Sequence, residues 1–245
     1  MFGQCGTHVI NCSLVIINST AIERNTSAIG LLFPGGGGAG KFDFQKVVEL
    51  YITSILILLG IFGNITSIVV LRKDRERKNA LFLLQALALA DGLYLVVAIF
   101  RYPLKYLLPS HEKFIAIQPI VFPLLKTFQT VTIWMIVIVT IDRYTCVCRP
   151  LLAPCLFNQK TRRGYTLALF VAGFLYNIPR FLDSCVYKWY NPCTGAVVSR
   201  MSYRESFSGP YYYNIYIDIM YIVLLYVIPL STLIFMNCRL VQAIR

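Results

Sequence analysis

Five long apolar segments alternate with short polar segments along the chain. Each has about the twenty residues that a helix needs to cross the hydrocarbon core of a bilayer. A helix satisfies its own backbone hydrogen bonds in lipid, so runs of this length predict membrane-spanning helices. The pattern predicts an all-α polytopic membrane protein with its bundle in residues 46–245. The expected spans cover residues 47–71, 79–102, 119–144, 165–182 and 211–236.

Positive charges between the spans predict the orientation of the chain. Residues 72–78 read Arg-Lys-Asp-Arg-Glu-Arg-Lys, with five positive and two negative side chains. Cytoplasmic loops are enriched in Lys and Arg, so this segment is expected inside the cell and the N-terminus outside. Arg149, Lys160, Arg162 and Arg163, which follow the third span, agree with this orientation.

The composition fits a lipid bilayer better than any other partner. The 245 residues are 57% hydrophobic and 14% charged, whereas about a quarter of the residues of a soluble domain are charged. A net charge of +12 can indicate binding to nucleic acid. Here the positive charges cluster in the short segments between the spans, as expected of cytoplasmic loops, so no nucleic-acid partner is expected.

No enzymatic motif is visible in the sequence. There is no Gly-rich phosphate loop, HExxH or GxSxG pattern, so the chain is not expected to be an enzyme or to carry an organic cofactor. The eight cysteines form no CxxC pair and there are only two histidines, which argues against a transition-metal site.

Residues 1–45 are expected to form a disordered extracellular tail. The glycine run at residues 35–38 cannot hold a helix. Asn11, Asn18 and Asn25 each begin an Asn-x-Ser/Thr sequence, which predicts glycosylation outside the cell.

Glycines and polar residues inside the spans point to helix contacts and to function. Gly60 and Gly63 predict close approach of a neighbouring helix. Asp91 falls at the centre of the second span, where a carboxylate is costly unless it faces the bundle interior. Asn64 must also find a partner inside the bundle, and Pro229 permits a kink in the fifth span.

Several of these residues occur in the order and spacing of one receptor family. Gly63-Asn64, Leu87-Ala88-Leu89-Ala90-Asp91, Asp142-Arg143-Tyr144 and Pro229 lie on four separate spans. Together they resemble the rhodopsin-like (class A) G protein-coupled receptors. The resemblance implies the first five helices of a seven-helix bundle, without helices six and seven. We therefore expect a fragment or a non-signalling isoform, with a full-length receptor as one candidate partner.

Three further segments resemble invertebrate receptors for FMRFamide-type neuropeptides. They are Phe128-Gln129-Thr130, Cys146-Val147-Cys148-Arg149-Pro150-Leu151 and Tyr176-Asn177-Ile178-Pro179-Arg180-Phe181. This resemblance implies a plasma-membrane receptor for an extracellular peptide, with a heterotrimeric G protein as its inner partner. A class A receptor for another peptide or an amine is the first alternative. A small transporter or channel subunit using Asp91 and Lys126 is the second, although no inverted repeat supports it.

The resemblance assigns roles at the inner end and in the middle of the bundle. Asp142, Arg143 and Tyr144 would form the inner lock that couples to the G protein, with Asp142 and Arg143 pairing locally. Asp91 and Thr132 resemble part of a sodium site, since a hard cation prefers oxygen ligands. The alternative is a neutral, hydrogen-bonded Asp91.

At the outer end, an amidated Arg-Phe peptide would present a guanidinium, which a carboxylate binds well. Asp218 is the predicted carboxylate, with Glu112 and Asp183 as rivals. Lys126 and Gln129 would bind the amide carbonyl, and Phe181 would contact the peptide's phenylalanine. The alternative is an interfacial aromatic belt with a solvated acid.

The cysteines depart from the family pattern. The family usually has a cysteine where this chain has Gln118, so the usual disulfide to the second outer loop cannot form. A disulfide between Cys185 and Cys193 is one candidate, and pairing with the tail's Cys5 or Cys12 is another; the sequence does not choose among them. The usual tryptophan of the fourth helix is also absent, since residues 170–174 read Phe-Val-Ala-Gly-Phe.

Overall fold

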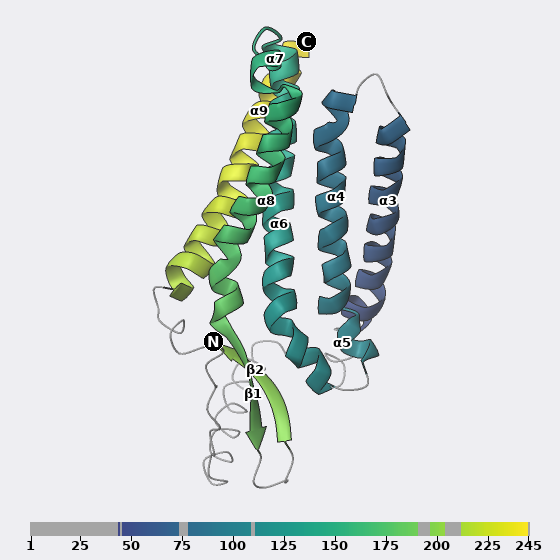
Figure 1. The fold of residues 1–245 in the computed structure, drawn as a ribbon, viewed down its shortest axis with the longest axis vertical. Helices are drawn as coiled ribbons and strands as arrows, with labels where there is room; N and C mark the ends of the chain where they lie inside the picture. The colour runs from purple at the N-terminus through teal and green to yellow at the C-terminus, as the bar shows by residue number, and fades with distance from the viewer. Residues whose placement is uncertain are drawn as a thin grey trace, which may run out of the picture.

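The chain folds into a bundle of long helices with a β-hairpin at one end (Figure 1). The computed structural model describes Phe44 and residues 46–73, 78–108, 111–190, 197–203 and 212–244. Five of the described helical segments are long and apolar enough to cross a membrane, which confirms the predicted fold class. The helices are η1 (Val47–Ile52), α3 (Thr53–Lys73), α4 (Lys78–Arg101), α5 (Leu104–Leu107), α6 (His111–Cys148), α7 (Ala153–Leu156), α8 (Gln159–Asp183), η3 (Tyr212–Met220), η4 (Val223–Val227) and α9 (Ile228–Ile244).

Helix α6 is the centre of the bundle. It contacts α4, α8 and α9, while α3 packs on α4. It begins at His111, earlier than the predicted residue 119, and continues through Pro119 and Pro123. The prediction placed the start of this helix at its first proline, whereas prolines within a membrane helix are accepted where neighbouring groups compensate for the lost donor.

Local signals explain other helix boundaries. Asn158 caps α8, since its Oδ1 accepts a hydrogen bond from the backbone N–H of Thr161 at 2.8 Å. The fifth span consists of two π-helical segments, η3 and η4, followed by α9 with Pro229 in its first turn. The change from π-helix to α-helix at Ile228 directly precedes Pro229, which lacks the N–H of a regular helical hydrogen bond.

Two apolar clusters hold the helices together. The cluster nearer α7 consists of Leu83, Ala86, Ala90, Val131, Met135 and Phe157. The cluster nearer the hairpin consists of Ile57, Val97, Ala98, Leu125 and Phe128. Both include residues of α4 and α6, so this helix pair contributes most to the core.

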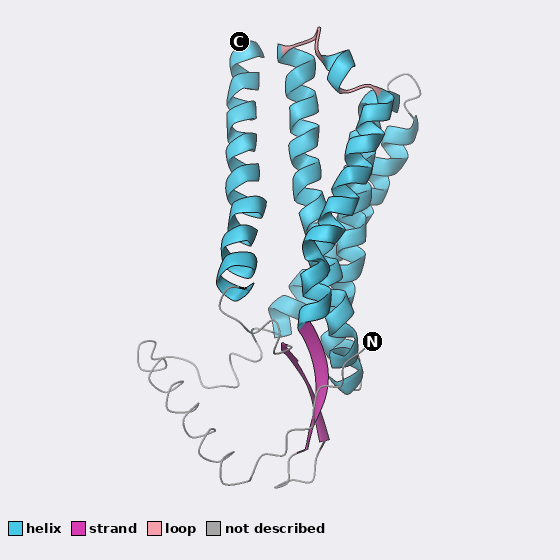
Figure 2. Ribbon diagram, turned by 60° about the vertical axis from the view of Figure 1, so that its left-hand side comes forward, coloured by secondary structure: helices cyan, strands magenta, loops and turns pink. Residues whose placement is uncertain are grey.

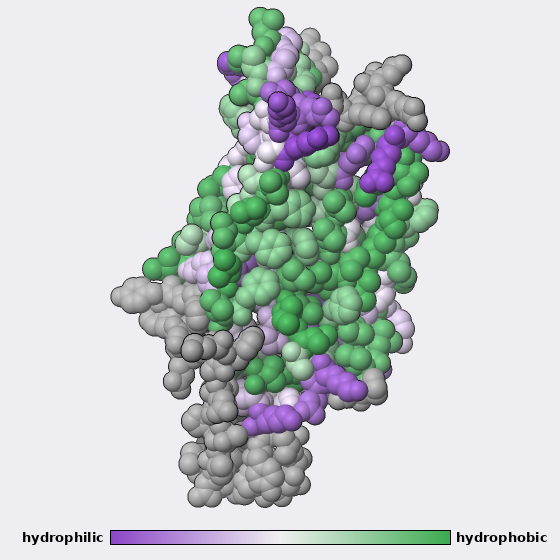
Figure 3. Space-filling model, viewed as in Figure 1, coloured by the Kyte–Doolittle hydropathy of each residue, from purple (hydrophilic) through white to green (hydrophobic). Residues whose placement is uncertain are grey.

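The outer surface of the bundle is apolar. Leu58, Phe62 and Leu230 are exposed by 66%, 71% and 58%. Figure 3 shows an apolar band along the helices, with hydrophilic residues gathered toward both ends. Exposed apolar area of this extent would be a liability in water but is expected against lipid. The protein is therefore a multi-pass membrane protein.

The segment that follows α8 contains two strands that the sequence did not predict. Strand β1 (Ser184–Tyr190) pairs antiparallel with β2 (Val197–Tyr203), from Ser184 opposite Tyr203 to Tyr190 opposite Val197. Both strands contact α6, and Figure 2 shows the hairpin at the end opposite the C-terminus. Lys188 of β1 forms an ion pair with Glu112 of α6 at 3.2 Å, which ties the hairpin to the bundle.

Two glycines lie at close helix contacts. A Cβ atom on Gly60 of α3 would lie 2.7 Å from Leu95 Cδ1, which confirms the predicted close approach. A Cβ atom on Gly173 of α8 would lie 2.7 Å from Val131 Cγ2 of α6. The same prediction for Gly63 was wrong, because nothing lies within 4 Å of its Cβ position.

Replacing Gly173 with alanine is expected to lower the free energy of unfolding by about 1–3 kcal/mol. The new methyl group would overlap Val131, whose branched side chain has little freedom to move. The measurement is the melting temperature of the purified protein in detergent. Gly63→Ala is the matched control and is expected to have no destabilising effect; equal losses in both variants would contradict the prediction.

Candidate ligand-binding and signalling sites

Three polar side chains join α6 to the fifth span in the half of the bundle nearer the hairpin (Figure 1). Lys126 Nζ donates to Gln129 Oε1 at 3.1 Å and to Tyr221 Oη at 2.9 Å. Tyr221 Oη donates to Gln129 Oε1 at 3.0 Å. Lys126 and Gln129 are three residues apart on one helix, so they share a face. The structure thus brings together two residues that the sequence predicted for ligand binding.

Arg180 of α8 lies beside this group and is 3% exposed. Its guanidinium carbon lies 5.4 Å from the ring centre of Tyr216 and 5.3 Å from that of Tyr221. Its Nε atom is buried and has no hydrogen-bond partner among the described residues. Asn177, one turn earlier, donates to Thr130 Oγ1 at 3.3 Å and to the carbonyl of Gly173 at 2.8 Å.

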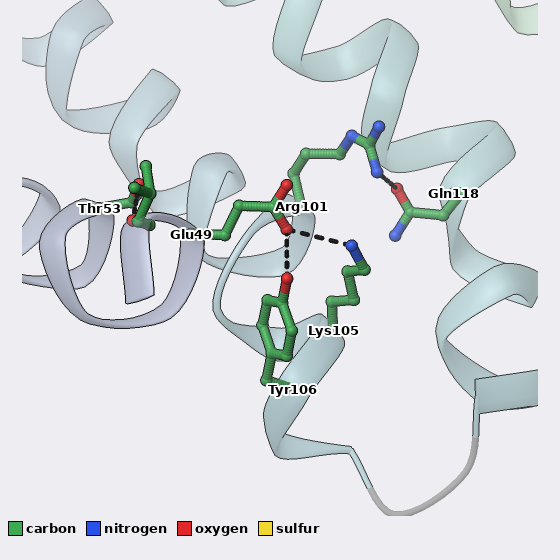
Figure 4. Close-up of polar contacts among 7 residues, drawn as sticks. Glu49, Thr53, Arg101, Lys105, Tyr106 and Gln118 are labelled. Atoms are coloured by element: carbon green, nitrogen blue, oxygen red, sulfur yellow. Dashed lines mark hydrogen bonds and ion pairs between the residues drawn. The ribbon is translucent and has the colours of Figure 1, made fainter. Parts of the chain in front are cut away.

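A cavity of about 320 Å³ lies between this region and the hairpin, lined by Arg101, Gln118, Phe122, Met201 and Ser202. Arg101 donates to Gln118 Oε1 at 3.3 Å, as Figure 4 shows. Gln118 is buried, and its Nε2 also donates to the carbonyl of Phe114 at 3.4 Å. The residue in place of the family's usual cysteine therefore orients Arg101 at the cavity.

The other predicted ligand-binding residues lie at the edge of this region. Phe181 is half-buried at the end of α8, and Asp218 is exposed on η3. No described hydrogen bond or ion pair joins Asp218 to Lys126 or Gln129. Asp183 is 2% exposed and accepts a hydrogen bond from Ser184 Oγ.

A second polar contact, at the hairpin end of the bundle, fixes the start of the first span. Glu49 Oε2 of η1 accepts hydrogen bonds from Lys105 Nζ at 3.1 Å and from Tyr106 Oη at 2.7 Å (Figure 4). Lys105 and Tyr106 belong to α5, which lies between the second and third predicted spans. This contact ties η1 to α5, the short helix that follows α4.

At the end of the bundle that carries α7, Asp142 is 1% exposed and pairs with Arg162 of α8. Arg162 Nη2 lies 2.7 Å and its Nε 3.2 Å from Asp142 Oδ1. The sequence interpretation instead paired Asp142 with the adjacent Arg143. Successive residues on a helix point about 100° apart and do not face each other, so the carboxylate faces α8 while Arg143 and Tyr144 lie half-buried on other faces.

The predicted sodium residues lie between α3, α4 and α6. Asp91 and Asn64 line a cavity of about 470 Å³. Thr132 is close enough to interact with the Asp91 carboxyl, yet its buried Oγ1 has no partner at hydrogen-bonding geometry among the described residues. An unsatisfied oxygen beside a carboxylate fits a cation, although these groups supply only part of a sodium shell. The sodium site stays a prediction.

The disulfide prediction is only partly within the described residues. Cys185 is disulfide-bonded, and the described Cys146, Cys148, Cys155 and Cys238 are free. Cys193 lies outside the described residues, so the pairing of Cys185 with Cys193 stays a prediction. Asn11, Asn18 and Asn25 also lie outside them.

Comparison with known proteins decides the family. Residues 63–245 match the sequence model described as "7 transmembrane receptor (rhodopsin family)". The chain belongs to this family. Among similar proteins, this rhodopsin-family receptor is 28% identical over 210 residues to the FMRFamide receptor of Drosophila melanogaster, a match that covers 81% of this chain and 38% of that protein. It is 30% identical over 196 residues to the FMRFamide peptide receptor frpr-18 of Caenorhabditis elegans, covering 77% and 44%. The chain therefore spans less than half the length of these relatives.

Sequence reasoning missed several residues of this receptor's polar sites. Arg162, Tyr216 and Tyr221 act through partners on other helices, which sequence spacing does not reveal. Arg180 was noted only as part of a family-like segment. An arginine inside an apolar span is itself a functional signal, and this signal could have placed Arg180 among the candidates.

Proposed function

We propose that this receptor binds an FMRFamide-like neuropeptide outside the cell and passes a conformational change to a heterotrimeric G protein inside. The observation that carries this proposal is that both relatives described above are named as FMRFamide receptors. Membership of the rhodopsin family supports the inner partner. The relatives are longer than this chain, so the ligand and the G protein belong to the proposal.

The receptor would lie in the plasma membrane with its N-terminus outside. Arg72 and Lys73 end α3 at the same end of the bundle as α7 and the start of α8, which carries Arg163. Clustered positive charge at one end supports a cytoplasmic location for that end. The hairpin and the Lys126 region would then face the extracellular side.

Asp218 is our proposed partner for the arginine of the peptide. Among the described acids of the outer half, Glu49 pairs with Lys105 and Glu112 with Lys188. Asp183 is almost fully buried. Asp218 is exposed and has no ion pair among the described residues, so its carboxylate is available for a guanidinium.

Other outer residues would complete the contact. The Lys126 ammonium and the Gln129 amide can each donate to a carbonyl oxygen of the peptide. Phe181 is half-buried at the outer end of α8 and offers an aromatic face to the peptide's phenylalanine.

The inner end would act as a two-state element. Asp142 is held by Arg162, while Arg143 and Tyr144 lie half-buried next to it. A peptide that binds one bundle conformation more tightly shifts the population toward it. In that state Arg143 would contact the G protein, as the family resemblance implies.

The test is the response of cells to FMRFamide. Cells expressing the longest form of the receptor that its gene encodes are expected to activate a G protein pathway when the peptide is added, with no response in untransfected cells. A receptor that reaches the cell surface and responds to an unrelated peptide or an amine, but not to FMRFamide, would favour the alternative ligand class and contradict the proposal.

A further inference from the structure

Cations and aromatic rings alternate across the outer half of the bundle. Phe122 lies between Arg101 and Lys126, whose charged groups are 5.8 Å and 5.9 Å from its ring centre. Tyr221 lies between Lys126 and Arg180, at 4.9 Å and 5.3 Å. These five residues, which we call the cationic row, come from α4, α6, α8 and the fifth span. Packing of separate helices therefore concentrates positive charge at one depth.

The cationic row has no described counterion. Within the described residues, none of its three cations has a carboxylate within 4.0 Å. Other cations of the bundle do: Lys105, Arg162 and Lys188 pair with Glu49, Asp142 and Glu112. Arg101 and Arg180 are also near enough to Lys126 to interact electrostatically with it. Like charges held together disfavour the empty row, and an anion would relieve that repulsion.

Arg180 gives the strongest sign of a missing partner. The side chain is 3% exposed, and its buried Nε has no hydrogen-bond partner among the described residues. On the preceding turn, the buried Tyr176 hydroxyl also has none. A buried charge is costly unless it is paired and hydrogen-bonded. Tyr216 is close enough for a side-chain hydrogen bond with Arg180, and aromatic faces attract cations, but the Nε donor still has no described partner.

We infer that the cationic row binds a carboxylate of the ligand, which would accept a hydrogen bond from the Arg180 guanidinium and lie near the Lys126 ammonium. The ligand class rests on the proposed function: the carboxylate is an acidic side chain of the peptide, beyond the Arg-Phe amide end. The row would repel the peptide's arginine, which leaves that arginine for Asp218. Two opposite charges on the peptide would then fix its direction in the site.

The test uses two peptides that differ by one charge, Glu-Phe-Met-Arg-Phe-amide and Gln-Phe-Met-Arg-Phe-amide. Their affinities are measured on the longest form of the receptor in phosphatidylcholine nanodiscs, so that no anionic lipid competes. The Glu peptide is expected to bind about tenfold more tightly or better. In Arg180→Gln and Lys126→Gln this preference is expected to fall to about twofold or less.

Lys188→Gln is the matched control, because Lys188 is an outer cation whose side chain is 69% exposed and which lies outside the row. It is expected to keep the full preference. If Arg180→Gln fails to fold, Arg101→Gln replaces it in the test, because Arg101 is a half-buried cation of the row. Arg101→Gln is also expected to reduce the preference for the Glu peptide. A preference that survives in the row variants, or that is absent in the unaltered receptor, would overturn the inference.

A second readout separates this inference from the proposed function. N-acetyl-glutamate amide is expected to raise the melting temperature of the receptor in the same nanodiscs more than N-acetyl-glutamine amide does, and Lys126→Gln should abolish the difference. If FMRFamide binds but the Glu and Gln peptides are equal, the inference alone fails. If no peptide binds, the proposed function fails. The difference in melting temperature between the two small amides then tests by itself whether the cationic row binds a carboxylate.

Discussion

Replacing Arg162 with methionine is expected to lower the free energy of unfolding by about 3–5 kcal/mol, because it leaves a buried charge without its partner. Asp142 is 1% exposed, and the Arg162 guanidinium holds its Oδ1 through two nitrogens. Methionine keeps the apolar length of the side chain but supplies no donor. The measurement is the melting temperature of the purified receptor in nanodiscs, with surface expression in cells as a second readout.

A double-mutant cycle separates the pair from the loss of one arginine. Asp142→Asn in the Arg162→Met background removes the orphaned charge, so the double variant is expected to be more stable than Arg162→Met alone. Lys160→Met is the matched control, since Lys160 is an exposed cation in the first turn of the same helix, and it should change stability by less than about 0.5 kcal/mol. Additive effects in the cycle would show that the pair is not coupled.

Replacing Asp218 with asparagine is expected to weaken FMRFamide binding by about tenfold or more. The substitution keeps the size of the side chain and removes the charge that we assign to the peptide's arginine. Asp218 is exposed, so the fold should not change. Glu112→Gln removes a rival acid that already pairs with Lys188 and is expected to keep the affinity within about twofold.

The peptide supplies the second half of this test. Citrulline has nearly the shape of arginine but no charge, so the citrulline form of FMRFamide should bind the unaltered receptor about tenfold more weakly or worse. Against Asp218→Asn, the arginine and citrulline peptides should bind equally. If Asp218→Asn still prefers the arginine peptide over the citrulline peptide as strongly as the unaltered receptor does, another residue binds the arginine.

The number of spans could be predicted from the sequence, whereas their irregularities could not. Length and hydrophobicity alone fix where a helix crosses lipid, and α4 (Lys78–Arg101) agrees closely with the expected residues 79–102. The early start of α6 depends on how neighbouring groups compensate for Pro119 and Pro123, and hydropathy does not distinguish π-helical from α-helical segments. The β1–β2 hairpin depends on its packing against α6.

For the candidate site too, spacing along one helix could be predicted from the sequence, whereas contacts between helices could not. The spacing of Lys126 and Gln129 on one helix sufficed to place them together. The contacts of Tyr221 with Lys126, and of Arg162 with Asp142, join residues far apart in the chain. Such contacts follow from helix packing and rotation, which hydropathy does not specify. For this reason the interpretation chose the adjacent Arg143 for Asp142 and overlooked the cationic row.

The central claim is that an FMRFamide-like peptide drives this receptor to activate a G protein. The most direct measurement places the purified receptor, in the longest form that its gene encodes, in nanodiscs with purified heterotrimeric G proteins and follows nucleotide exchange. Our account predicts that FMRFamide accelerates exchange with a saturable dose dependence, and that Asp218→Asn shifts the curve to higher concentration. A folded receptor whose exchange rate does not change at any FMRFamide concentration, with members of each G protein class, would contradict it.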